Sequence, residues 1–214
     1  GIEDVCLPLN NIINSMLSTS EFPNKWKRAQ IRPIPKVACP SKYKDYRPVS
    51  ILFHLGKLSE EVIINKMRSK LEHVIEPAQF AYQPHIGTVD ALIKLLDDFT
   101  SELDNPNVKY IQSAALDFSK AFDRLQPALL MQKLEGYNFN PRIISLISSF
   151  LDNRLQCVKY GNEQSQYIST KVGAPQGTKL GPILWLLYSN DLAADGFNHI
   201  KYADDTTFYT SVVN

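Results

Sequence analysis

Apolar and polar residues follow two periods along this chain, and each period predicts one kind of element. Apolar positions three or four residues apart predict amphipathic helices in the first half, over residues 7–17, 55–74 and 88–103. Thr88 is the expected N-cap of the third helix. Pro33 and Pro35 exclude a regular helix, so we expect extended backbone over residues 26–36.

The second half of the chain predicts short strands separated by helices. Residues 110–116 are small and apolar and predict a buried strand. Strand–turn–strand patterns predict hairpins over residues 155–170 and 199–210. Helices are expected between these strands, over residues 127–136, 141–153 and 180–193. Together the elements place the chain in the α+β class.

Composition limits the size and the compartment of the protein. The 214 residues are 44% hydrophobic, enough for a sizeable core in one domain or two closely packed subdomains. The richest apolar run, residues 183–188, is far too short to cross a bilayer, and the first residues lack the pattern of a secretion signal. We therefore expect an intracellular protein of the cytoplasm, the nucleus or both, not secreted and without a membrane partner.

Charge is unevenly distributed, although the net charge is only +1. Residues 24–70 hold 12 Lys or Arg and 3 Asp or Glu, which leaves 11 basic and 19 acidic residues in the rest of the chain. A basic first third beside an acidic remainder fits a phosphate-binding region that faces a metal-binding one. Lysines that only solvate the surface would give the same count.

Asp117, Asp204 and Asp205 are the acids with the clearest chemical meaning. Asp204 and Asp205 are neighbours at the tip of the second predicted hairpin, where their charges repel each other. Asp117 directly follows the predicted buried strand, an unfavourable place for an unpaired carboxylate. Mg²⁺ prefers oxygen ligands, and three carboxylates brought together would suit two ions about 4 Å apart. A solvated turn at Asp204 and a helix cap at Asp117 are the alternatives.

Several motifs, in order along the chain, resemble those of reverse transcriptases from non-LTR retrotransposons. Motif A of that family is resembled by Asp117-Phe118-Ser119-Lys120-Ala121-Phe122-Asp123. Motif B is resembled by Gly173-Ala174-Pro175-Gln176-Gly177-Thr178-Lys179-Leu180-Gly181-Pro182, and motif C by Tyr202-Ala203-Asp204-Asp205-Thr206. The motifs that resemble its fingers, and the block between fingers and palm, are Arg32-Pro33-Ile34-Pro35-Lys36, Tyr46-Arg47-Pro48-Val49-Ser50 and Gln79-Phe80-Ala81-Tyr82. The resemblance runs from about Trp26 to the end of the chain.

The resemblance implies the fingers and palm of a right-hand polymerase, with a small antiparallel palm sheet backed by helices and no thumb. We expect an N-terminal helical extension over residues 1–22, a fingers-like subdomain over 23–108 and a C-terminally incomplete palm over 109–214. The implied activity is RNA-directed DNA polymerisation, in which a primer 3′ hydroxyl attacks the α-phosphate of a deoxynucleoside triphosphate. The implied cofactor is a pair of Mg²⁺ ions, with Mn²⁺ as a substitute.

Partners and metal ligands follow from the same resemblance. The partners are an RNA template, a DNA primer and the nucleotide, together with thumb and endonuclease domains of one polyprotein. Asp117, Asp204 and Asp205 are implied as the catalytic metal ligands, with the backbone carbonyl of Phe118 as a further ligand. Tyr202, with its neighbour Ala203, is implied to lie near the primer and the template.

The residues implied to bind the nucleotide are Lys36, Arg47, Phe122, Gln176 and Gly177. Lys36 and Arg47 would hold the triphosphate, because Arg offers a planar fork to phosphate oxygens and Lys a point charge. The Phe122 ring would clash with a ribose 2′ hydroxyl and so select deoxynucleotides; an ordinary core ring is the alternative. Gln176 would bond the sugar or the template base, and Gly177 would let the backbone approach the substrate.

Two rival interpretations remain open. The chain begins without Met and ends soon after Asp205, so we expect a fragment with weak or no activity by itself. The first rival is a decayed or domesticated descendant that binds RNA or protein without catalysis. The second is an RNA-dependent RNA polymerase, and both Phe122 and the Tyr-Ala-Asp-Asp sequence argue against it.

Overall fold

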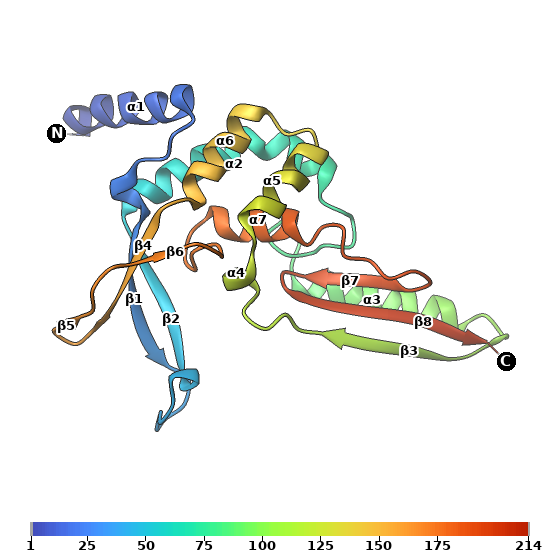
Figure 1. Cartoon of the computed structure of the whole chain (residues 1–214). Helices are drawn as coiled ribbons and strands as arrows, with labels where there is room; N and C mark the ends of the chain where they lie inside the picture. Colours follow the sequence, from blue (N-terminus) through green and yellow to red (C-terminus); the bar gives the residue numbers. More distant parts are fainter. Residues whose placement is uncertain (1, 214) are drawn as a thin grey trace.

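Two sheets lie at opposite ends of the molecule, and a group of helices fills the space between them (Figure 1). This arrangement comes from a computed structural model that describes residues 2–213, with side chains from residue 4 onward. Within that range, no helix is at once long enough and apolar enough to pass through a membrane.

The first sheet is built on two strands rich in proline and basic residues. β1 (Arg28–Pro35) pairs antiparallel with β2 (Tyr46–Leu52), and β4 (Arg154–Tyr160) runs parallel to β1 on its other side. The short strands β5 (Glu163–Gln164) and β6 (Ile168–Thr170) both pair with β4. β4 pairs with β1 only as far as Ile31. Pro33 and Pro35 therefore lie in the part of β1 that has no neighbour on the β4 side, where the missing proline N–H leaves no carbonyl of β4 without a donor.

The second sheet is antiparallel, with its strands in the order β3-β8-β7. These strands are β3 (Val108–Leu116), β7 (Asn198–Tyr202) and β8 (Asp205–Val213), and α3 (Thr88–Leu103) covers one face of the sheet (Figure 1). The predicted hairpin over residues 199–210 is confirmed. The predicted burial of residues 110–116 is wrong: β3 is an edge strand with most of its residues exposed, because α3 packs on only one side of it.

The main hydrophobic core lies among the central helices. These are α2 (His54–Val74), α5 (Pro127–Gly136), α6 (Pro141–Leu151) and α7 (Leu180–Tyr188), with the single turn α4 (Ala121–Arg124) beside α7. α1 (Ile2–Thr19) joins this core through Met16, and Phe22 packs edge-on against Phe150 of α6. Short 3-10 turns, η1 (Asn24–Lys27) and η2 (Tyr43–Asp45), precede β1 and β2.

Helix positions follow the sequence pattern closely, and the differences lie at the helix ends. α1 starts earlier than predicted, at Ile2. Thr88 is the first residue of α3 rather than its cap; the backbone N–H of Gly87 donates to the Asp90 carboxylate instead (2.7 Å). α7 ends at Tyr188 rather than near residue 193, because the carbonyls of the next residues, including Ser189, accept hydrogen bonds from the buried Lys201 ammonium.

The division into subdomains at residue 108 remains a prediction, and the sheets do not follow it. β4, β5 and β6, from the second half of the chain, complete the sheet that β1 and β2 begin. α3, from the first half, packs on the second sheet. The chain therefore crosses between the two ends of the molecule more than once (Figure 1).

Candidate active site

Strand register brings the three predicted catalytic acids to one end of the second sheet. β3 pairs with β8 as far as Leu116 opposite Thr206, so Asp117, the first residue after β3, lies at the same end of the sheet as Asp205, the first residue of β8. Asp204 lies beside Asp205 in the turn of the β7–β8 hairpin. The backbone therefore places the three acids as neighbours.

Their side chains repel one another and are not gathered around a common point. Burial raises the pKa of the Asp205 carboxyl, and the negative charges of Asp204 and Asp117 raise it further. Yet within residues 2–213 no three His, Cys, Asp or Glu side chains are close enough together to hold a metal ion. Both findings hold, because Coulomb repulsion acts over longer distances than metal coordination does. The assignment of the acids as metal ligands stays a prediction.

Lys36, Arg47 and Gln176 line one cleft of about 930 Å³ beside the first sheet. Lys36 directly follows β1, and its backbone N–H donates to the carbonyl of Asp45 (2.7 Å), which fixes the start of the loop. Arg47 lies in β2 and is exposed. The structure thus brings together three residues that the sequence predicted to hold the nucleotide, although they come from distant parts of the chain.

The segment after Asp117 links the acid end of the second sheet to this cleft. Lys120 and Asp123 both line the cleft, and they follow Asp117 by only a few residues. Lys120 has a left-handed backbone (φ 57°), after which the single turn α4 begins. One short segment therefore runs from the predicted metal ligands to the predicted phosphate ligands.

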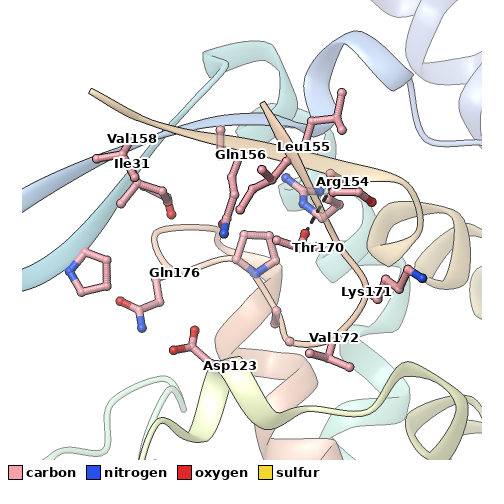
Figure 2. A pocket seen from close by; sticks show the side chains of 18 residues that line it. Ile31, Asp123, Arg154, Leu155, Gln156, Val158, Thr170, Lys171, Val172 and Gln176 are labelled. Carbon is pink, nitrogen blue, oxygen red and sulfur yellow. Dashed lines mark hydrogen bonds between the residues drawn. The ribbon is translucent and has the colours of Figure 1, made fainter. Parts of the chain in front are cut away.

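A second cavity, of about 520 Å³, shares a wall with the cleft and is drawn in Figure 2. Gln176 and Asp123 line both hollows. Arg154 at the base of β4 is buried there, with its guanidinium donating to the carbonyl of Phe150 (3.0 Å) and lying over the Phe150 ring. Burial lowers the pKa of Arg154 to about 10. Its buried cation supports the α6–β4 junction rather than offering a free charge to a ligand.

Two glycines let the loop before α7 fit between other segments. A Cβ on Gly173 (φ 87°) would lie 2.9 Å from the carbonyl oxygen of Phe122, and one on Gly177 (φ 87°) would lie 3.0 Å from that of Ser50. The loop is also bonded to the segment after Asp117, since the N–H of Ala174 donates to the Phe122 carbonyl (2.8 Å). Gly177 was predicted to allow a close backbone approach to the substrate. In the structure the backbone close to Gly177 is that of Ser50 in β2, and a contact with substrate remains a prediction.

The start of α7 is held by two polar residues that sequence reasoning did not single out. Buried Glu60 of α2 accepts hydrogen bonds from the backbone N–H groups of Lys179 (2.6 Å) and Leu180 (3.0 Å). The Thr178 hydroxyl accepts from the N–H of Gly181 (3.0 Å). Burial raises the pKa of Glu60, and the two N–H groups partly oppose that rise. In the sequence, Glu60 is one more charge on an amphipathic helix, which hides its burial.

Aromatic rings from the Asp117 segment pack on Trp185 of α7. The Phe118 ring lies edge-on to it, with centroids 5.6 Å apart, and the half-buried Phe122 ring is tilted against it at 6.1 Å. Both the predicted sugar-selecting role of Phe122 and the alternative of core packing are compatible with this position. Trp185 was expected only as part of an apolar helix.

An antiparallel sheet with three acids at one end, joined by a short segment to a basic cleft on a second sheet, is the arrangement expected of a right-hand polymerase. Residues 34–212 match the family described as "Reverse transcriptase (RNA-dependent DNA polymerase)". The chain therefore belongs to the reverse transcriptase family, as its motifs indicated.

Relatives from retrotransposons cover most of this chain. It is 30% identical over 211 residues to the RNA-directed DNA polymerase from mobile element jockey of Drosophila melanogaster, which covers 93% of this chain and 23% of that protein. It is 31% identical over 198 residues to the Retrovirus-related Pol polyprotein from type-1 retrotransposable element R1 of Bradysia coprophila (89% of this chain, 19% of that protein). The predicted resemblance to the non-LTR type is confirmed. The chain spans less than a quarter of the length of either relative.

Solved structures confirm the predicted fold class. The chain is similar to telomerase of Candida tropicalis in complex with a TWJ fragment of telomeric RNA, with a TM-score of 0.63 and 16% identity over 94% of this chain and 40% of the other. Apo telomerase of the same species, truncated from its C-terminal domain, gives a TM-score of 0.63 and 16% identity over 87% of this chain and 44% of the other. At 16% sequence identity, the similarity to these structures shows a shared fold and nothing about function.

Proposed function

We propose that this chain is the fingers and palm part of an RNA-directed DNA polymerase of a non-LTR retrotransposon. It transfers deoxynucleotides to the 3′ hydroxyl of a DNA primer on an RNA template. The observation that carries the proposal is the continuity from Asp117 to Asp123, which joins the three acids to the cleft of Lys36 and Arg47. Phosphates held in that cleft would contact the same short segment that begins at Asp117.

Asp117, Asp204 and Asp205, with the carbonyl of Phe118, are the proposed ligands of two Mg²⁺ ions. Carboxylate oxygens are the donors that Mg²⁺ prefers. None of the ion pairs in residues 2–213 involves these three acids, so their charges have no neutralising partner from that part of the chain. The charges of Asp117 and Asp204 both act on Asp205, so we expect rotation of the three side chains to bring their oxygens together around a cation. When bound, such ions activate the attacking oxygen and stabilise the leaving oxygens.

Other residues orient the substrate. The Arg47 fork and the Lys36 ammonium bind the triphosphate, since both line the cleft and both are exposed there. Phe122 supports the sugar, and Gln176 contacts the sugar or the template base from the loop that it shares with Gly177. Tyr202, on the hairpin next to the acids, packs beside the primer end.

A non-catalytic RNA-binding module is the second candidate. Such a module needs no metal site, so carboxylates that stay apart are compatible with it as well. In this case the basic cleft would bind an RNA backbone without nucleotide transfer.

Primer extension separates the two candidates. The chain, alone and within a longer polypeptide that contains it, is tested on an RNA template with a DNA primer in Mg²⁺ and in Mn²⁺. We expect extension by the longer unaltered polypeptide, weak or no extension by the chain alone, and a loss of about a thousandfold when Asp204→Asn is made in the longer polypeptide, since a metal contributes several kcal/mol to the transition state. Asp195→Asn, at an exposed aspartate before β7, is the matched control. Equal extension by the unaltered protein and Asp204→Asn would refute the site, and RNA binding without extension would favour the second candidate.

A further inference from the structure

Gln79 is a buried polar residue in the connection between α2 and α3, only 3% exposed. A side-chain amide is rarely buried so deeply unless its hydrogen bonds are satisfied. Its Oε1 accepts from the backbone N–H of Ala81 (2.9 Å) and from that of Ala203 (3.1 Å). Its Nε2 also approaches the carbonyl oxygen of Ala203, at 3.5 Å. One side chain therefore contacts both backbone polar groups of a single residue far away in the sequence.

Ala203, the residue that Gln79 contacts, has an unusual backbone conformation. It lies in the β7–β8 turn directly before Asp204 and Asp205, and its backbone is left-handed (φ 60°). That conformation costs an L-residue roughly 1–2 kcal/mol, so the surroundings must hold it in place. The indole N–H of Trp185 supplies a further bond to the Ala203 carbonyl (3.3 Å). The turn that carries the two acids thus depends on contacts from outside the hairpin.

The backbone around Gln79 is itself anchored to the hairpin. The N–H of Phe80 donates to the carbonyl of Lys201 (2.9 Å), and the N–H of Lys201 donates to the carbonyl of Ala78 (2.8 Å). The Lys201 side chain is buried and pairs with Glu76 at the start of the same connection. The α2–α3 connection is therefore bonded to β7 on both sides of Gln79, and the amide cannot drift relative to the turn.

We propose that Gln79 is a positioning residue of the active site, which holds the Tyr202–Asp205 turn so that Asp204 and Asp205 face Asp117. The inference rests on the proposed function and adds a residue that acts through the hairpin backbone, not through substrate. A side-chain amide suits this task because it both accepts and donates. A carboxylate could still accept from the Ala203 N–H, whereas an aliphatic side chain could do neither.

Three variants and a control test the proposal. Gln79→Leu removes both contacts to Ala203, Gln79→Glu keeps the acceptor, and Trp185→Phe removes the separate indole donor. Gln83→Leu is the matched control, because Gln83 donates to the backbone carbonyl of Gln79 and has no hydrogen bond to the hairpin among the described residues. The measurements are amide hydrogen exchange over residues 202–205, the melting temperature, and kcat and KM for nucleotide incorporation.

We expect Gln79→Leu to speed exchange at Ala203 at least tenfold beyond any change in the other β7 and β8 amides. The same variant should lower kcat by about ten- to a hundredfold with KM nearly unchanged, since small displacements of reacting groups have effects of this size. Trp185→Phe should speed exchange less, Gln79→Glu should restore part of the protection and of kcat, and Gln83→Leu should leave both unchanged.

Three outcomes would overturn the proposal. Unchanged exchange at Ala203 in Gln79→Leu would show that the amide does not hold the turn. Faster exchange spread evenly over the second sheet would assign Gln79 to folding alone. Loosening at Ala203 with an unchanged kcat would separate the turn from catalysis. If the longer unaltered polypeptide incorporates no nucleotide, the proposed function fails, and the exchange comparison still decides whether Gln79 holds the turn.

Discussion

The predicted ligand residues of the two sheets differ in how closely they are already brought together. Beside the first sheet, Lys36, Arg47 and Gln176 already line one cleft, and glycines fit the loop of Gln176 against its neighbours. At the end of the second sheet, the pairing of β3 with β8 brings Asp117 and Asp205 to the same edge, but no three carboxylates of the described residues lie close enough to hold an ion. The difference follows from charge: cations on long side chains spread around a cleft, whereas three adjacent anions separate until a cation joins them.

The largest effect should come from replacing one of the three acids, because their negative charges are what would bind a cation at the second sheet. Mn²⁺ at about a hundred times its dissociation constant should stabilise the unaltered chain by about 2.7 kcal/mol, since it binds the folded state only. Asp117→Asn should lose most of this stabilisation and nearly all primer extension. Melting curves with and without Mn²⁺ measure the first quantity. Equal stabilisation of the unaltered chain and Asp117→Asn would place the ion elsewhere, and Asp195→Asn is again the control.

Phe122 lies on the segment that joins the three acids to the cleft of Lys36 and Arg47. A variant at Phe122 tests whether the nucleotide sugar binds beside this segment. Phe122→Val should raise the ratio of ribonucleotide to deoxynucleotide incorporation by about thirtyfold, an effect of about 2 kcal/mol, because the ring no longer excludes a 2′ hydroxyl. Phe118→Val is the control, since it removes the other ring that contacts Trp185. A parallel change in both variants would mean that loss of packing, not loss of a gate, alters the selectivity.

Local patterns predicted most elements of the fold but not how distant segments meet. The 3.6-residue period marks α2 and α3 almost to their ends, and alternation marks the β7–β8 hairpin. The parallel pairing of β1 with β4 joins segments more than a hundred residues apart and leaves no local signal. Burial of β3 was mispredicted for a related reason: an edge strand covered on one face and a central strand can share the same composition.

The candidate site divides in the same way. Motif resemblance identified Lys36, Arg47 and Gln176, and the cleft unites them. It gave no role to Gln79 or Glu60, because a polar side chain that bonds backbone groups looks like a surface residue in the sequence. Residues of this kind become visible only when their burial and their partners are known.

The phosphate side of the comparison is sharpened by Lys36→Ala and Arg47→Ala. Each variant should raise the KM for the nucleotide by about tenfold with a smaller change in kcat, the loss of one charge-assisted contact of about 1.4 kcal/mol. Arg47→Lys should recover only part, since an ammonium cannot replace the planar fork. Steady-state kinetics at several nucleotide concentrations measure the split. An unchanged KM in both alanine variants would exclude the cleft as the triphosphate site.

The smallest expected effect on catalysis comes from the junction of α2 and α7, which supports the loop of Gln176 and whose variants change stability instead. Burial raises the pKa of Glu60 above its ordinary value of 4.5, so the folded chain holds this proton more tightly than the unfolded chain does. Between 4.5 and the raised pKa, the stability of the unaltered chain should therefore fall as pH rises. Glu60→Gln cannot ionise and should remove this slope, whereas Glu60→Leu leaves two backbone N–H groups unpaired and should lower stability by about 1–3 kcal/mol at every pH.

The neighbouring Glu61 gives this last prediction a control of opposite sign. Its carboxylate accepts a hydrogen bond from the Lys179 ammonium, and this bond lowers the pKa of Glu61 below the ordinary value. Its contribution to stability is therefore present above pH 4.5 and is lost as pH falls through the lowered pKa, so Glu61→Gln should remove a slope of the other sign. Urea unfolding at pH values from 3 to 8 measures both variants. If stability depends on pH identically in Glu60→Gln and Glu61→Gln, Glu60 ionises as readily as Glu61. The loop of Gln176 would then lack the buried support that distinguishes the first sheet from the second.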